Sequence, residues 1–220
     1  RFGLDYESVR QANPALIYCS ISGFGTRGGA SLPGYDLIVQ AMSGLMSLTG
    51  DPDGAPYRAG ISVFDVMAGL HSAVGILAAL RHRDATGAGQ LLETNLMSTA
   101  LSGLVNQTAA YVSGGTVPFR MGNAHPSLFP YEPLPNQLTT HPAAHWFERL
   151  NAAGVPCGPI NTIGQGVEYA RELGLDPVVF AGSGQHAVPV VRNPITDSAT
   201  PPRYDLAPPS LGEHTEQIRA

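Results

Sequence analysis

One long apolar segment, residues 61–90 (ISVFDVMAGLHSAVGILAALRHRDATGAGQ), constrains the fold more than any other part of the chain. Its spacing predicts a helix over residues 65–83, which the turn TGAGQ ends. The many Ala, Gly and Ser residues would let a neighbouring helix approach closely. The larger apolar residues recur at helical spacing and predict a buried face, comprising Val66, Leu70, Val74, Leu77 and Leu80.

Strands and helices alternate along the first half of the chain. ALIYCSIS (residues 15–22) predicts a strand that enters a glycine-rich loop over residues 23–29, and LLETNL (91–96) predicts a short buried strand. Helices are predicted over residues 6–13, 36–48 and 98–115. This alternation predicts a layered α/β domain.

The pattern changes after residue 115. A segment rich in proline and glycine predicts an ordered loop or a crossing between domains. HPAAHWFERLNAAG (141–154) predicts an amphipathic helix, and VPCGPIN (155–161) predicts a strand and tight turn. A proline-rich stretch over residues 201–218 leads into a last helix near Glu213.

Charge and composition exclude several classes of partner. The 220 residues carry a formal net charge of −5, which gives no basic surface for nucleic acid. We expect no membrane segment, because no run of 18 or more uninterrupted apolar residues occurs. Cys19 and Cys157 form neither a disulfide framework nor a metal-ligand spacing, which predicts reduced thiols, a cytoplasmic protein and no metal site.

Asp65 is the one carboxylate at the leading edge of the long apolar helix. It has two interpretations. As an N-cap it would accept hydrogen bonds from free main-chain amides, and the helix dipole would favour its ionised form. As a nucleophile, the same ionised carboxylate, flanked by Gly60 and Gly69, would face a ligand. His71, two turns into the helix, fits a core or interface histidine better than a catalytic one.

Six motifs, in this order, carry a resemblance to a known family: NPALIYCSISGFG, GYDLIVQAMSGLMSLTG, the 61–90 segment, RMGNAHPSLFPY, GVPCGPINTI and PPSLGEHT. The string resembles the class III coenzyme A transferases. The resemblance implies a Rossmann-like large α/β domain, a smaller α+β domain and an interlocked homodimer. It implies a large domain over residues 1–117, a small domain over 118–190, and a segment over 191–220 that returns to the large domain.

The resemblance implies CoA transfer from an acyl-CoA to a small carboxylic acid, with CoA as substrate and no permanently bound cofactor. Asp65 is then the nucleophile, which forms an aspartyl anhydride and an aspartyl-CoA thioester. The loop Ser22, Gly23, Phe24 and Gly25 corresponds to a family segment that touches CoA, although some members have Lys at the position of Ser22. A plain strand-to-loop turn is the alternative for this loop.

The loop RMGNAHPS resembles a family loop that closes over the reacting centre. Asn123, Ala124 and His125 replace part of a longer glycine run there. His125 would bind the acceptor carboxylate or, alternatively, pack against Pro126. The pattern is closer to members that use dicarboxylates such as succinyl-CoA or glutarate than to the oxalate-using form.

Two other functions remain open. An α-methylacyl-CoA racemase shares the fold, with an Asp at the position of Asp65 and a His where this chain has Tyr35. A phenol ionises only near about pH 10 and is a poor base at neutral pH, which favours a transferase. Tyr35 would then line the pocket or pack. A non-catalytic interaction protein on the same fold is the third alternative.

Two segments expected from the resemblance are not found in the sequence. A βαβ region that holds much of the CoA adenosine site would precede Arg1. About half of a small domain would lie at the junction of Pro135 and Asn136.

Overall fold

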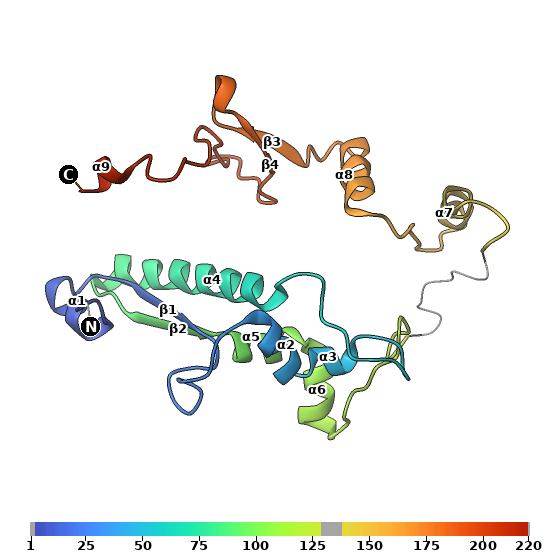
Figure 1. Ribbon diagram of the computed structural model, residues 1–220, viewed down its shortest axis with the longest axis horizontal. Helices are drawn as coiled ribbons and strands as arrows, with labels where there is room; N and C mark the ends of the chain where they lie inside the picture. Colours follow the sequence, from blue (N-terminus) through green and yellow to red (C-terminus); the bar gives the residue numbers. More distant parts are fainter. Residues whose placement is uncertain (1–2, 129–137, 220) are drawn as a thin grey trace. The chain divides into compact units, whose positions relative to one another are not determined.

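The computed structural model describes residues 3–128 and 138–219 (Figure 1). The chain divides into two compact units, Arg1–Leu134 and Pro135–Ala220, which are described here separately. The domain bounds expected from the resemblance stay a prediction. The proposed junction at residues 135 and 136 lies outside the described residues.

The first unit is built on two parallel strands joined through a long helix. β1 (Tyr18–Ser22) pairs with β2 (Leu91–Asn95), in a register that runs from Tyr18 opposite Leu91 to Ser22 opposite Asn95. Parallel strands need a crossover connection, and here it contains α4 (Val63–Thr86), which lies along both strands (Figure 1). The predicted layered α/β arrangement and its central helix are confirmed.

The buried face of α4 is formed by small residues, not by the predicted Val and Leu stripe. Phe64, Ala68, Ser72 and Ala79 are buried, whereas Val66, Leu70, Val74 and Leu77 are 57–68% exposed and Leu80 is half-buried. The reason is the close approach of the sheet: a Cβ on Gly75 would lie 2.8 Å from the methyl groups of Leu92 on β2. By length and composition α4 is also apolar enough to cross a membrane.

The core of the first unit lies under the start of α4. It joins Val39 of α2, Phe64 and Ala68 of α4, and Leu96 and Ala100 of α5, with Phe24, Leu45, Val63 and Met67 packed against them. α2 spans Asp36–Met42 and α5 spans Leu96–Gly103. The first turn of α4 is therefore anchored by Phe64, the neighbour of Asp65.

Two predicted helices are each divided into two. Residues 36–48 form α2 and α3 (Leu45–Leu48), because Gly44 takes a φ of 99° that a continuous helix does not allow. Residues 98–115 fall in α5 and α6 (Val105–Gly114), which meet at Val105 with a φ of 41°. The short helix predicted over residues 6–13 is confirmed as α1 (Tyr6–Ala12).

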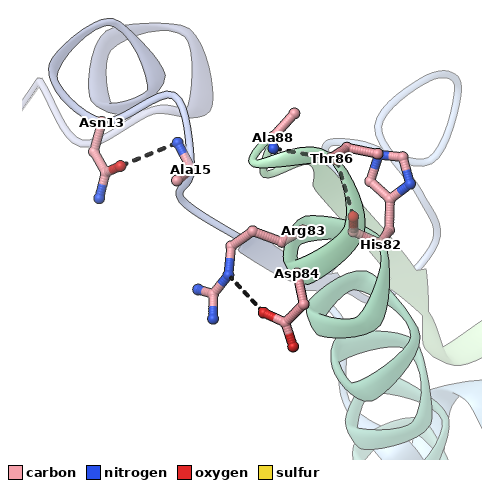
Figure 2. Close-up of polar contacts among 7 residues, drawn as sticks. All are labelled: Asn13, Ala15, His82, Arg83, Asp84, Thr86 and Ala88. Atoms are coloured by element: carbon pink, nitrogen blue, oxygen red, sulfur yellow. Dashed lines mark hydrogen bonds and ion pairs between the residues drawn. The ribbon is translucent and has the colours of Figure 1, made fainter.

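The C-terminal end of α4 is closed by local hydrogen bonds (Figure 2). Gly87, with a φ of 75°, ends the helix and donates its N–H to Arg83 O at 2.7 Å. The Thr86 hydroxyl donates to His82 O at 2.9 Å and accepts from Ala88 N at 3.2 Å. Asp84 forms an exposed ion pair with Arg83 at 3.9 Å.

Over residues 138–219, the second unit contains two helices, a hairpin and a short last helix. α7 (Ala143–Ala152) confirms the amphipathic helix, and α9 (Thr215–Arg219) confirms the last one. α8 (Ile163–Glu172) begins with a capping box between Thr162 and Gln165. β3 (Val178–Ala181) and β4 (Val188–Val191) pair antiparallel around a 3-10 turn, Gly184–His186. The strand predicted over residues 155–161 is wrong, because that segment forms no ladder with a neighbour.

Candidate active site

Asp65 is the third residue of α4 and does not cap it. The N-cap position belongs to Ser62, whose side chain makes no capping hydrogen bond. Asp65 is exposed, and within the described part of the chain its carboxylate accepts no hydrogen bond. The capping interpretation of Asp65 is therefore wrong, and its carboxylate is left available to a ligand.

The cap of α4 comes instead from Asp36, the first residue of α2. Asp36 Oδ2 accepts from the main-chain N–H of Phe64 at 2.7 Å and of Asp65 at 3.1 Å. The Asp36 side chain is buried, with 7% of its surface exposed. A carboxylate 29 residues away in the sequence thus satisfies the first-turn amides that an isolated helix would leave free.

Gln40, one turn further along α2, completes this arrangement. Its amide nitrogen donates to Asp36 Oδ1 and to the carbonyl oxygen of Ile61, the latter at 3.2 Å. Its amide oxygen accepts from Ala59 N at 2.8 Å. Gln40 is fully buried. Both ends of its amide therefore bind the segment that leads into α4.

The surroundings of Asp65 raise the pKa of its carboxyl group above the usual 3.8. The larger cause is partial desolvation, and the second is the negative charge of Asp36. The helix dipole alone would lower the pKa of Asp65. The pKa is raised instead, because the first-turn amides of Phe64 and Asp65 are already hydrogen-bonded to Asp36. A more basic carboxylate is a better nucleophile toward a thioester carbonyl.

The loop after β1 lies at the same edge of the sheet as the start of α4. In a βαβ unit the N-terminus of the helix and the carboxyl ends of both strands share one edge, where ligands of such sheets bind. Ser22 ends β1 opposite Asn95, and its hydroxyl accepts from Gly25 N at 3.1 Å. Contacts of Ser22 and Gly25 with CoA stay predictions.

Gly23 and Phe24 have structural tasks in this loop. A Cβ on Gly23 would lie 2.4 Å from Gly34 Cα, so two main-chain segments cross there. Phe24 packs against the core that contains Phe64. The turn interpretation therefore accounts for both residues, whatever they contribute to CoA binding.

Tyr35 immediately precedes Asp36 and is 69% exposed. It therefore projects from the chain beside the residue that binds the main-chain amide of Asp65. His71 is exposed, and its Nδ1 lies 2.8 Å from Met67 O in the preceding turn of α4. It is not the core histidine that the helical pattern favoured.

The second predicted loop is attached to the turn between α3 and α4. Arg120 Nε donates to Asp51 O at 3.2 Å, and Gly122 N donates to Gly50 O at 3.1 Å. Asn123 and Ala124 are exposed, and half-buried His125 accepts a hydrogen bond from Ser127 N on Nδ1 at 3.0 Å. Closure of this loop over Asp65 stays a prediction.

Asp36 and Gln40 are the site residues that sequence reasoning missed. The available signal was an acid and an amide four residues apart in a helix of otherwise mostly apolar residues, DLIVQAM. Polar residues at such spacing share one helix face. They could have been assigned to the buried face only if their partners, far along the chain, had been known.

Comparisons with known proteins show the family to which the chain is related. The CoA-transferase family III profile matches residues 1–137 and 132–215. The chain is 37% identical to the succinate–glutarate CoA-transferase of Agrobacterium fabrum, over 100% of this chain and 68% of that protein. It is 43% identical to the succinyl-CoA:mesaconate CoA-transferase of Haloarcula hispanica, over 60% of this chain and 35% of that protein.

A solved structure also matches this chain over nearly its whole length. The structure of a CAIB/BAIF family protein from Brucella suis superimposes with a TM-score of 0.87 and 31% identity. The match covers 99% of this chain and 70% of that one. Because the family profile matches nearly the whole length of this chain, the chain belongs to the class III CoA-transferases.

Proposed function

We propose that this chain carries the nucleophile of a CoA-transferase that moves CoA from an acyl-CoA donor to a dicarboxylic acid acceptor. The observation that carries the proposal is the state of Asp65. Its carboxylate is exposed, unbonded among the described residues and more basic than usual, while its main chain is fixed by Asp36.

The first half of the cycle moves CoA onto the protein. A carboxylate oxygen of Asp65 attacks the thioester carbonyl carbon, the C–S bond breaks, and CoA leaves as a thiolate. The product on the protein is a mixed anhydride. The thiolate then attacks the aspartyl carbonyl carbon of this anhydride, which releases the donor acid as a carboxylate and leaves an aspartyl-CoA thioester.

The second half repeats these steps in the opposite direction. The acceptor carboxylate attacks the aspartyl thioester, and the thiolate leaves again. The thiolate attacks the acceptor's carbonyl carbon in the new anhydride, which restores the Asp65 carboxylate and gives the new acyl-CoA. Each step exchanges one carboxylate or thiolate for another, so the cycle needs no net proton transfer and no metal.

The class of acceptor is supported by the named relatives. The Agrobacterium and Haloarcula proteins are named for succinate, glutarate and mesaconate, all of them dicarboxylates. His125 is the side chain we assign to the acceptor's distal carboxylate. Its Nδ1 accepts a hydrogen bond from Ser127 N, which orients the ring within this loop.

The test combines turnover with trapping. Wild-type protein is incubated with succinyl-CoA and glutarate, and glutaryl-CoA is measured. Hydroxylamine added during turnover should convert Asp65 to a hydroxamate that peptide mass spectrometry locates. Asp65→Asn should show neither product nor label, and Asp84→Asn, at the other end of α4, should show both. Transfer without any label on Asp65 would assign the nucleophile elsewhere, and no transfer from any acyl-CoA would reject the function.

A further inference from the structure

Asp36 is a buried carboxylate that forms no ion pair within the described residues. Burying such a group is unfavourable unless donors replace the lost water. Here three N–H donors do so: Phe64 N, Asp65 N and the side-chain amide of Gln40. Two of the three belong to the first turn of α4. Apolar residues at positions 36 and 40 would be enough to pack α2 against α4, so packing alone does not explain these two polar residues.

The direction of each hydrogen bond fixes the chemical identity of both residues. Both oxygens of Asp36 must accept, one from Gln40 and the other from the two main-chain amides. Gln40 must donate from Nε2, because Ile61 presents a carbonyl oxygen, and must accept on Oε1, because Ala59 presents an N–H. Flipping the Gln40 amide would therefore break all of its bonds at once.

The first turn of α4 depends on these bonds. The first four N–H groups of a helix have no partner within it. The first main-chain bond of α4 runs from Val66 N to Ser62 O at 3.2 Å, so the amides of Phe64 and Asp65 have Asp36 as their acceptor. Without Asp36 the residue that carries the nucleophile would lie on a frayed helix end.

We propose that Asp36 and Gln40 form a positioning pair, which holds the main chain of Asp65 fixed while its side chain is acylated and released. The proposal rests on the proposed function, because Asp65 must be the nucleophile. Neither residue touches the substrate. Gln40 fixes Asp36 and the segment from Ala59 to Ile61, and Asp36 fixes the turn that presents Asp65.

The charge of Asp36 also acts on the covalent intermediates. Free Asp65 is an anion close to a second anion, whereas Asp65 is neutral in the anhydride and in the thioester. The repulsion is therefore present only in the resting state, and acylation relieves it. Asp36 is the one charged group found to act on Asp65 within the described residues.

Two isosteric variants and their combination test the pair. Asp36→Asn turns one acceptor into a donor that faces another donor. Gln40→Glu replaces the donor to Asp36 with a second carboxylate. When both substitutions are combined, the introduced amide can donate to the introduced carboxylate and still accept from the two main-chain amides of α4, and only the bond to Ile61 O is lost. Asp84→Asn is the matched control on the same helix.

The first readout is hydrogen exchange, which needs no activity. In each single variant the amides of Phe64 and Asp65 should exchange about tenfold faster or more, while the middle of α4 keeps its protection. The double variant should recover much of the protection. Unchanged exchange at both amides in Asp36→Asn would overturn the proposal.

The second readout is the division between kcat and KM. The single variants should lose about 10- to 100-fold in kcat, as misplaced reacting groups do, with the KM for acyl-CoA nearly unchanged. The double variant should regain part of the kcat. The acid limb of the kcat profile should move to lower pH in Asp36→Asn, because a negative charge near Asp65 is gone. A kcat equal to wild type, or a loss confined to KM, would contradict positioning.

The two proposals fail in different ways. If wild type transfers no CoA or takes no label on Asp65, the proposed function is wrong, and the exchange data still decide whether the pair holds the turn. If wild type transfers CoA through Asp65 but the single variants match it, the positioning pair alone is wrong.

Discussion

Gly23 and Gly34 cross main chain to main chain at the base of the loop that follows β1: a Cβ on Gly23 would lie 2.4 Å from Gly34 Cα, and a Cβ on Gly34 would lie 2.8 Å from Gly23 Cα. Neither glycine has a φ in the left-handed region, so the requirement is for space. The crossing directs the chain from the strand end at Ser22 back to Asp36, the residue that caps α4.

Gly23→Ala should therefore destabilise the protein by about 1–3 kcal/mol, the usual cost of overpacking, because main-chain atoms must move to admit one methyl group. Urea unfolding would measure this change. Gly28→Ala is the matched control in the same loop, since a Cβ there meets nothing within 4 Å. Equal stability of the two variants would show that the crossing is not tight in solution.

Asp65→Asn should abolish transfer and slightly stabilise the fold at neutral pH. The pKa of Asp65 is raised in the folded state, so the folded protein binds a proton at Asp65 more readily than the unfolded chain does. The stability of wild type from this group therefore falls as pH rises from about 3.8 through the raised folded-state pKa. The gain should stay under about 1 kcal/mol, because Asp65 is exposed and its charge is screened.

The pH dependence of stability tests whether the Asp65 carboxylate lowers the stability of the fold at neutral pH. Thermal unfolding of wild type and Asp65→Asn should differ at pH 7 and converge at acid pH, where both side chains at position 65 are neutral. A variant that is less stable than wild type at pH 7 would indicate that the Asp65 carboxylate makes a stabilising contact.

Tyr35→Phe should leave transfer within about threefold of wild type, because no proton is abstracted in the proposed cycle. Tyr35 is 69% exposed, so removing its hydroxyl should not affect folding. The matched assay is incubation of a 2-methylacyl-CoA in D₂O. Exchange of the α-hydrogen at the rate of turnover, lost in Tyr35→Phe, would favour the racemase alternative.

We predict a homodimer, as the family resemblance implies. The exposed stripe of α4, with Val66, Leu70, Val74 and Leu77 all at least 57% exposed, is the kind of surface that requires a cover. Light scattering at micromolar concentration should give twice the 23.0 kDa of one chain. A mass of one chain would contradict the prediction.

The sequence predicted the presence of α4 well and its orientation poorly. Apolar residues at helical spacing indicated a helix close to Val63–Thr86. Because Ala, Gly and Val all occur on its faces, the pattern could not tell that Ala68 and Ala79 are buried while Leu70 is exposed. That choice is made by Leu92 on β2, which leaves no room for a side chain at Gly75.

The candidate site shows the same limit. Asp65 could be singled out because it stands alone at the edge of an apolar helix, and its neighbours in the sequence resemble a family. Its environment could not be predicted, because the cap comes from Asp36, which precedes it by 29 residues. The break at Gly44 is different: the Ser-Gly pair there was a local signal, and the helix was nevertheless predicted as continuous.

The hold of Gln40 on Ala59 and Ile61 has a consequence for how the protein can be altered. Gln40 fixes the segment just before α4 at Ala59 and Ile61. A second hydrogen bond, from Tyr57 N to Thr49 O at 3.0 Å, closes the turn that precedes this segment. Residues Pro52 to Pro56 lie between Thr49 and Tyr57, the two ends of this hydrogen bond, and are mostly exposed. Insertions between Pro52 and Pro56 should therefore leave the main chain at the start of α4, and with it Asp65, in place.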